Sequence, residues 1–233
     1  MVKEELVKKS PLRVLEKSLH GGLGGGNIGV LASPKGVGKT ACLVHIATDK
    51  LLQGQPVIHV SYSARVDYII TWYEDIFREL AKKRKLEAAV DIHDELVRNR
   101  VIMNFKQDGT RTEAVLRSVE AMIGIGRFAA RAIIVDGYDF TIGTESDLAR
   151  FKDFARKTGV EVWFSASLKE AAGPLYGEDG MPIVLKKLAG AIDVLITLHS
   201  RGDYVELRVV KDHDHPAPGL LKLKLDPKTL LIM

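Results

Sequence analysis

The sequence predicts an α/β protein with a mostly parallel central sheet, flanking helices and antiparallel strands near the C-terminus. Two observations predict this class. Short apolar runs rich in β-branched residues alternate with longer amphipathic stretches, and the apolar runs are nearly continuous, as in strands buried on both faces. The 233 residues suffice for one such domain with a substantial core. A composition of 46% apolar and 27% charged residues excludes a wholly disordered chain.

The individual elements follow from this pattern. The apolar runs predict parallel strands at residues 28–33, 56–62, 101–105, 132–136 and 160–167. The amphipathic stretches between them predict helices at residues 39–52, 66–86, 112–124 and 146–157. Three later segments alternate or run short between turn residues, which predicts antiparallel strands at residues 193–200, 204–212 and 220–226.

The domain organisation is predicted to be simple. Residues 20–233 form one domain, because no internal repeat or low-complexity linker interrupts them. Residues 1–19 form a basic, amphipathic N-terminal arm, which either packs on its own domain, frays, or docks on a neighbouring subunit. Within the predicted helix at 66–86, a row of apolar and aromatic residues at helical spacing is expected to face the core. The row consists of Trp72, Tyr73, Ile76, Phe77 and Leu80.

The strongest chemical signal is the segment SPKGVGKT at residues 33–40, which follows a predicted strand and opens a predicted helix. This is the context of a P-loop, in which backbone N–H groups and the helix N-terminus surround phosphate oxygens. Lys39 is expected to reach the β- and γ-phosphates, and Thr40 to place its hydroxyl on Mg²⁺. Ser33 replaces the usual first glycine, which is tolerable where the backbone needs no positive φ. The predicted phosphate-binding residues are Ser33, Pro34, Lys35, Gly36, Val37, Gly38, Lys39, Thr40 and Ala41.

A carboxylate follows another buried run. Asp136 ends the predicted strand at 132–136, where P-loop proteins hold their metal ion through water. Thr40 and Asp136 are therefore the predicted Mg²⁺ site. The alternative is a strand-terminal aspartate that only accepts hydrogen bonds from loop amides.

Taken in order, these segments resemble the RecA-type P-loop ATPases, in particular the DnaB helicases and KaiC-like proteins. The resemblance runs from about residue 15 to residue 233 and includes HGGLGGGNIGVLASPKGVGKTA and the ending VVKDHDHPAPGLLKLKLDPKTLLI. It implies a RecA-like fold, ATP with Mg²⁺ as the ligand, and a homo-oligomer in the form of a ring or filament. It also gives catalytic roles to Lys39, Asp136 and Lys211, the last acting on the nucleotide of a neighbouring subunit.

Two departures from the family bear on hydrolysis. Where the family has a glutamate that polarises the attacking water, this chain has Ser63 and Ala64, and Asp67 lies one helical turn onward. General-base catalysis contributes roughly 10²–10⁴ in rate. His213 stands where the family has an arginine finger, which is worth roughly 10³–10⁵ in phosphoryl transfer. The alternative is that other residues take over these two roles.

These features predict an ATP-binding protein with weak or absent hydrolysis, in which the nucleotide acts as an assembly or conformational switch. The alternative is an active oligomeric DNA-dependent ATPase of the helicase type. A third class, a scaffold that binds no nucleotide, is disfavoured by the intact pair of Lys39 and Thr40.

Nucleic acid is the less favoured partner. The segment at residues 168–190 resembles the DNA-contacting loop of the family, but it carries three basic and three acidic residues. Such a balance gives no electrostatic funnel for a phosphate backbone. The net charge of +4 lies mainly in the arm and around the phosphate loop. The charged residues of the segment are Lys169, Lys186 and Lys187 against Glu170, Glu178 and Asp179.

Other polar residues leave alternatives open. The resemblance implies that Ser165 or Ser167 senses the γ-phosphate, and the alternative is that both simply end a strand. His213 and His215 belong either to a polar turn or to a metal site. The single Cys42 excludes an internal disulfide and a cysteine-rich zinc site. Neither a signal peptide nor a membrane span is evident, so a cytoplasmic protein without membrane contact is expected.

Overall fold

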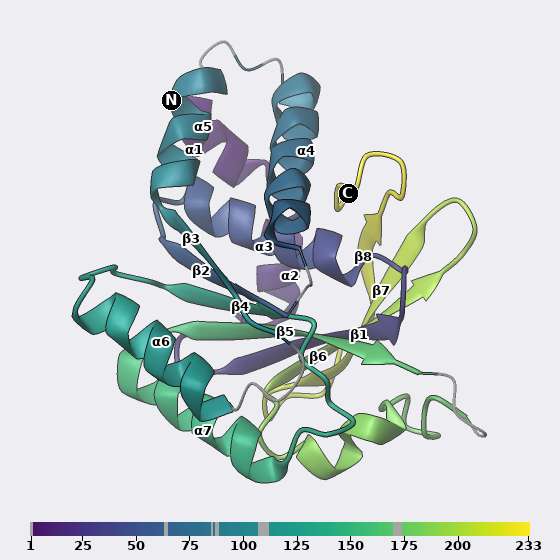
Figure 1. Ribbon diagram of the computed structural model, residues 1–233. Helices are drawn as coiled ribbons and strands as arrows, with labels where there is room; N and C mark the ends of the chain where they lie inside the picture. Colours follow the sequence, from purple (N-terminus) through teal and green to yellow (C-terminus); the bar gives the residue numbers. More distant parts are fainter. Residues whose placement is uncertain (1, 63–64, 85, 87–88, 107–111, 170–173) are drawn as a thin grey trace.

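The computed structural model describes residues 2–62, 65–84, 86, 89–106, 112–169 and 174–233, and within them a central sheet lies between two layers of helices (Figure 1). The strands are β1 (Ile28–Pro34), β2 (Val57–Ser61), β3 (Arg100–Asn104), β4 (Ala132–Asp136), β5 (Glu161–Leu168), β6 (Val194–Ser200), β7 (Val205–Asp212) and β8 (Gly219–Leu225). The helices are α1 (Val2–Lys8), α2 (Leu12–Ser18), α3 (Lys39–Leu52), α4 (Val66–Arg84), α5 (Ala89–Arg98), α6 (Thr112–Gly124), α7 (Glu145–Thr158) and the short 3₁₀ helix η1 (Ile183–Leu188).

The sheet topology confirms the predicted α/β class. Eight strands of the described chain pair in the order β3-β2-β4-β5-β1-β6-β7-β8. The pairs from β3 to β6 are parallel, and β7 and β8 continue the sheet in antiparallel fashion. Because parallel strands end at one edge, the segments that follow β1, β2, β4 and β5 meet there. In this order β5 separates β1, which precedes the predicted phosphate loop, from β4, which ends at Asp136.

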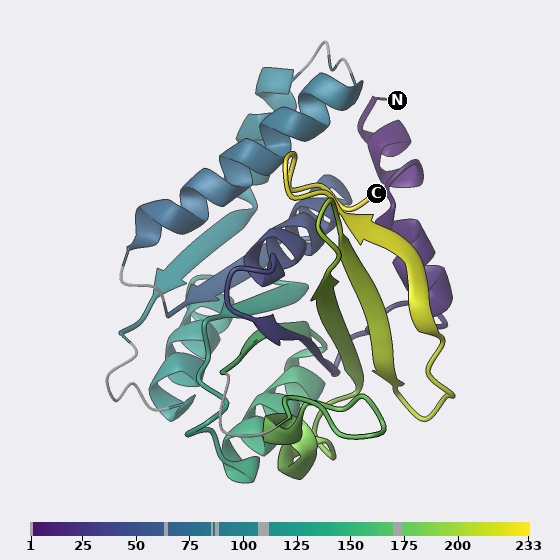
Figure 2. The ribbon, with the colours of Figure 1, turned by 90° about the vertical axis from the view of Figure 1, so that its right-hand side faces the viewer.

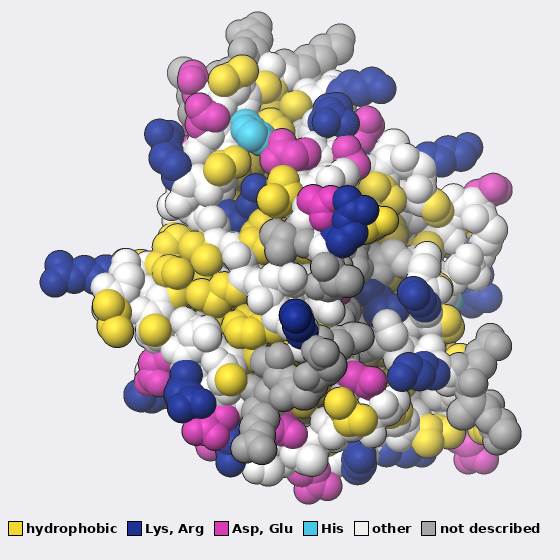
Figure 3. All heavy atoms as spheres, viewed as in Figure 1, with side chains coloured by type: hydrophobic (Ala, Val, Ile, Leu, Met, Phe, Trp, Pro, Cys, Tyr) yellow, Lys and Arg dark blue, Asp and Glu magenta, His cyan; other side chains and the backbone are white. Residues whose placement is uncertain are grey.

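Each face of the sheet has its own apolar core. Helices α1 to α5 cover one face, and α6, α7 and η1 cover the other (Figures 1 and 2). Successive strand residues point to opposite faces, so Leu31 joins the first core while Val30 and Ala32 join the second. β3 is one of the two edge strands, and apolar side chains gather along it on the left of Figure 3.

Four elements of the described chain are not among the predicted ones: the arm helices α1 and α2, the helix α5 and the 3₁₀ helix η1. The predicted helix at 66–86 is α4, which ends at Arg84 and is followed by the separate helix α5. α5 buries Ile92 and Leu96, one helical turn apart, and this short signal lay in a stretch to which no element was assigned. η1 lies in the segment at 168–190, which was expected to be a loop. On α4, Tyr73, Ile76 and Phe77 are buried in the core as predicted.

The N-terminal arm packs on its own domain. α1 contacts α3, and α2 contacts β8, beside which the arm lies in Figure 2. Its leucines Leu6, Leu12, Leu15 and Leu19 are all buried in the core that contains α3. Of the alternatives for the arm, packing on its own domain is therefore the arrangement in this chain. In the described parts of the chain, no helix combines the length and apolar content that crossing a membrane requires.

Candidate functional site

The predicted phosphate loop connects β1 to α3 at the carboxyl edge of the parallel strands. Gly36 has φ of 83° and Gly38 has φ of 115°, a left-handed region that glycine enters without steric cost. Gly38 precedes α3 and offers no side-chain acceptor to the first amides of the helix, so a ligand can accept their hydrogen bonds. Ser33 is buried and has no positive φ, which explains why a residue other than glycine fits there.

Lys39 is folded over this loop. Its buried Nζ donates hydrogen bonds to the carbonyl oxygens of Ser33, at 3.0 Å, and Pro34, at 2.8 Å. Burial lowers the pKa of Lys39 to about 8, although the nearby carboxylate of Asp136 opposes the shift. The ammonium is thus held where the loop, the start of α3 and the end of β4 meet.

Thr40 and Asp136, which are 96 residues apart in the sequence, are in direct contact. Thr40 Oγ1 donates a hydrogen bond to Asp136 Oδ2 at 2.9 Å. The second carboxylate oxygen is also bound, because Ser165 Oγ donates to Asp136 Oδ1 at 2.6 Å. Ser165 Oγ in turn accepts a hydrogen bond from the backbone N–H of Gly137 at 2.8 Å.

These residues form part of a cleft of about 450 Å³. Two basic side chains and one acidic side chain, that of Asp136, belong to the described residues that line it. One wall is aromatic and apolar and was not assigned to the site from the sequence, although Tyr68 and Trp72 stand one helical turn apart on α4. The lining consists of Lys35, Gly36, Gly38, Lys39, Thr40, Tyr62, Tyr68, Ile69, Trp72, Asp136, Gly137, Ser165 and Ser167.

The positions of the missing catalytic glutamate, Ser63 and Ala64, lie outside the described residues. Asp67, the nearest carboxylate along the chain, is exposed and accepts hydrogen bonds from the guanidinium of Arg65. This contact lowers the pKa of Asp67, and the residue does not belong to the described lining of the cleft.

Lys211 lies far from the cleft of its own chain. It pairs with Leu195 near the amino end of β6, whereas the phosphate loop follows the carboxyl end of β1. Its Nζ donates to the carbonyl oxygens of Ala189, at 2.7 Å, and Ile192, at 2.5 Å. Lys211 therefore lies at one end of the strands, and Lys39 and Asp136 lie at the other.

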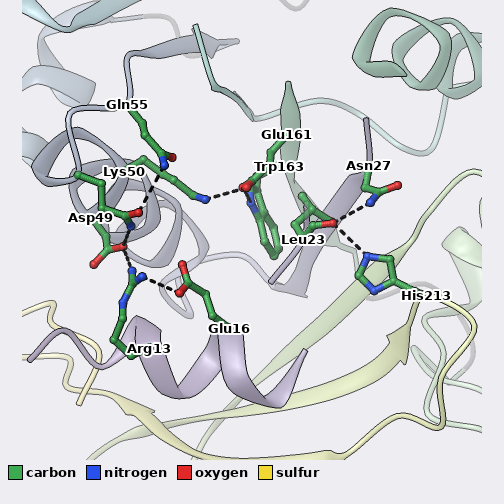
Figure 4. Close-up of polar contacts among 11 residues, drawn as sticks. Arg13, Glu16, Leu23, Asn27, Asp49, Lys50, Gln55, Glu161, Trp163 and His213 are labelled. Atoms are coloured by element: carbon green, nitrogen blue, oxygen red, sulfur yellow. Dashed lines mark hydrogen bonds and ion pairs between the residues drawn. The ribbon is translucent and has the colours of Figure 1, made fainter. Parts of the chain in front are cut away.

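His213 is also bound within its own chain. Its Nδ1 lies 2.8 Å from Asp212 Oδ1, and its Nε2 lies 3.0 Å from the carbonyl oxygen of Leu23, a contact drawn in Figure 4. The other oxygen of the buried Asp212 lies 2.9 Å from Nδ1 of His20, whose ring stacks on His215. These contacts join the turn between β7 and β8 to the segment before β1.

The donor set at Thr40 and Asp136 fits Mg²⁺ rather than a metal that needs a full protein cage. Among the residues with described coordinates, no group of three or more His, Cys, Asp or Glu side chains is arranged to hold a metal ion, and this includes the turn at His213. Mg²⁺ usually binds one or two protein oxygens, several waters and substrate phosphates. One hydroxyl beside one carboxylate matches that requirement.

Comparison with known proteins does not assign this chain to a family. No protein-family model matches the chain, and no curated protein sequence matches it. The functional argument therefore depends on the residues of the cleft and their contacts.

Proposed function

We propose that this chain is a RecA-like P-loop protein that binds Mg-ATP and hydrolyses it slowly or not at all, so that the nucleotide acts as an assembly or conformational switch. The observation that carries the proposal is the contact between Thr40 and Asp136 beside the buried ammonium of Lys39. Residues from the loop after β1, from the start of α3 and from the end of β4 line one cleft, and their chemistry suits a metal-bound triphosphate.

In this proposal the two halves of the ligand meet different groups. The phosphates would be held by the free amides at the start of α3 and by the ammonium of Lys39. Mg²⁺ would be held by the hydroxyl of Thr40 and, through water, by the carboxylate of Asp136. When bound, Mg²⁺ would supply charge neutralisation between the phosphate oxygens. The two lysines of the cleft, Lys35 and Lys39, add positive charge around the phosphates.

Slow hydrolysis is supported by the lack of a second carboxylate. Both oxygens of Asp136 accept hydrogen bonds from Thr40 and Ser165, and the described lining of the cleft contains no other acidic side chain. At the positions of the family's glutamate, Ser63 and Ala64 carry no group that is a base at neutral pH. Without a general base, hydrolysis would lose roughly 10²–10⁴ in rate.

A homo-oligomer is the arrangement in which Lys211 would meet a nucleotide. Lys211 lies at the amino-terminal ends of the parallel strands, whereas the cleft lies at their carboxyl ends. Lys211 could therefore reach the cleft of a second copy but not its own. Both Lys211 and His213 have partners within the chain, and each would have to release them to act on a neighbour. This requirement adds to the argument for slow turnover.

Binding is tested with a fluorescent ATP analogue in the presence of Mg²⁺. Wild-type protein should bind it, and Lys39→Ala should bind roughly 10- to 150-fold more weakly, the equivalent of the ~1.5–3 kcal/mol that hydrogen bonds to charged groups contribute. Lys222→Ala, at an exposed lysine of β8 that does not belong to the described lining of the cleft, is the matched control and should bind as wild type does. Absence of binding by the wild type would contradict the proposal.

Hydrolysis is tested by measuring ATP turnover with and without single-stranded DNA. The proposal expects turnover well below the usual enzyme range, whose lower end is about 1 s⁻¹, and no stimulation by DNA. A DNA-stimulated rate above that value would favour an active DNA-dependent ATPase instead.

A further inference from the structure

Ser165 is a buried serine that connects the two sides of the cleft. It lies on β5, between the strand of the phosphate loop and the strand of Asp136, and only 2% of its surface is exposed. Ser167 lies two residues onward on the same face of β5 but is exposed to the cleft. The sequence alone did not distinguish these two serines, whereas their burial and contacts do.

The hydrogen-bond directions around Ser165 are determined by its partners. The N–H of Gly137 donates to Ser165 Oγ, so the single hydroxyl proton of Ser165 points to Asp136 Oδ1. The hydroxyl proton of Thr40 points to Asp136 Oδ2. The carboxylate of Asp136 is therefore held from both sides, and its orientation relative to Thr40 depends on Ser165.

We infer that Ser165 is a positioning residue for the metal half of the site. By fixing the Asp136 carboxylate beside Thr40, it sets the affinity for the divalent cation that accompanies the nucleotide. It makes no contribution to the phosphate half, which Lys39 and the loop amides supply. This inference rests on the proposed function and assigns the cation-dependent part of nucleotide binding to a residue on the neighbouring strand.

The experiment titrates Mg²⁺ against binding of the fluorescent ATP analogue. Loss of a residue that orients a metal-ligating group typically costs roughly 10- to 100-fold in metal affinity. Ser165→Ala should therefore raise the midpoint Mg²⁺ concentration about tenfold or more, while binding of the analogue in EDTA should stay within about twofold of wild type. Mn²⁺ binding followed by electron paramagnetic resonance in the presence of the nucleotide gives the same comparison without any turnover.

Two further variants separate positioning from a structural role. Ser165→Thr keeps the hydroxyl and should restore most of the cation affinity. Ser167→Ala, on the same face of β5, should change nucleotide affinity by the same factor with and without Mg²⁺. Thermal unfolding of each variant shows whether it is folded. If Ser165→Ala is not, Ser165→Cys places a slightly larger thiol at the same position, which forms weaker hydrogen bonds.

The outcomes distinguish the inference from the proposed function. Wild-type protein that fails to bind the analogue with Mg²⁺ would refute both. Wild-type protein that binds with Mg²⁺, together with a folded Ser165→Ala variant of unchanged Mg²⁺ midpoint, would refute the inference alone. An equal loss of affinity with and without Mg²⁺ in Ser165→Ala would also refute it, because the serine would then act on the phosphates or on folding.

Discussion

Lys39 carries its positive charge in a buried position, and burial lowers its pKa to about 8 although Asp136 opposes the shift. Near pH 8 about half of these amines are therefore neutral in the free protein. The negative charge of a bound triphosphate favours the ammonium form and raises the Lys39 pKa. Nucleotide binding should thus be accompanied by proton uptake at mildly alkaline pH.

This linkage gives the first prediction at the scale of a residue. Below pH 8, the ionisation of Lys39 should leave the dissociation constant for the ATP analogue unchanged. Above pH 8, it should increase that constant by a factor that approaches ten for each pH unit. Calorimetry at pH 8.5 in two buffers of different ionisation enthalpy should show uptake of more than roughly half a proton. Lys39→Arg is the control, because a guanidinium remains charged and should remove the pH dependence. A level dissociation constant from pH 7.5 to 9.5 in the wild type would contradict the prediction.

The sequence identified Lys39, Thr40 and Asp136 because each stands at a fixed place in a local pattern of strand, loop and helix. The structure brings these three together as that pattern implied. The role of Ser165 was not predictable, since it depends on which strand lies beside β4. The aromatic wall of the cleft was missed for a related reason: Tyr68 and Trp72 look like core or surface residues until the position of α4 over the loop is known.

At the scale of an element, the packing of β1 against β5 depends on a small residue on one strand opposite a large residue on the other. Gly29 of β1 pairs with Trp163 of β5, and a Cβ on Gly29 would lie 2.4 Å from Cε3 of the tryptophan ring. The indole therefore covers the backbone of the strand that leads into the phosphate loop. Gly29 has no unusual φ, so it is the close approach of the ring that requires glycine here.

Gly29→Ala should accordingly destabilise the fold. Overpacking a buried site costs about 1–3 kcal/mol. For a chain of this size that cost lowers Tm by roughly 2–12 °C, measured by thermal unfolding. Gly124→Ala at the end of α6 is the matched control, because a Cβ there meets no atom within 4 Å, and it should leave Tm unchanged or raise it. Equal Tm values for the two variants would show that the Trp163 ring moves aside at no cost.

The sequence predicted most elements, because β-branched runs and amphipathic periods are local signals. It did not predict the order of the strands, which is set by packing between distant segments. Nothing local shows that β5 lies between β1 and β4, and this order is what joins Ser165 to Asp136 across 29 residues. α5 was missed because its apolar face is short, with Ile92 and Leu96 as its buried residues.

At the scale of the whole molecule, both ends of the chain converge on α3, the helix that begins at the phosphate loop. Figure 4 shows Arg13 of the arm between Asp49 of α3 and Glu16. From the other end of the chain, the N–H of Ile232 donates to Nδ1 of His45 on α3 at 3.0 Å. A Cβ on Gly38 would meet Leu225 of β8, so the C-terminal strand also lies against the loop. A displacement of α3 on nucleotide binding would therefore reach the arm and the C-terminal segment together.

At the amino-terminal ends of the parallel strands, opposite the cleft, His213 links the end of β7 to the segment before β1. Its ring nitrogens face two acceptors, a carboxylate oxygen of Asp212 and the carbonyl oxygen of Leu23, and the imidazolium, which carries a proton on each nitrogen, donates to both. Burial alone would lower the pKa of His213, but these hydrogen bonds and the nearby charges of Asp212 and Asp193 outweigh it, and the pKa is raised. His20 shares the carboxylate of Asp212.

The sign of the resulting pH dependence follows from this raised pKa. The contribution of His213 to stability is fully present below its unfolded pKa, about 6.5, and is lost as pH rises through the raised folded value. His45 and His59 act in the opposite direction, because burial lowers both of their pKa values to about 4. Their contribution to the stability of the fold is lost as pH falls below 6.5. Wild type and a variant at position 213 both retain His45 and His59, so the effect of these two histidines cancels in the difference between their unfolding free energies.

His213→Asn should therefore be less stable than wild type by about 1.5–3 kcal/mol near pH 6, the value of hydrogen bonds to a charged group, and the difference should shrink as pH rises toward 9. Asparagine suits the test because it is neutral and tolerates the positive φ of 48° at this position. Denaturant unfolding at pH 6, 7.5 and 9 measures the difference, with His215→Asn, on the same turn but exposed, as the control. A difference that is the same at all three pH values would mean that His213 is not an imidazolium in the folded protein, and that its contacts with Asp212 and Leu23 do not depend on its charge.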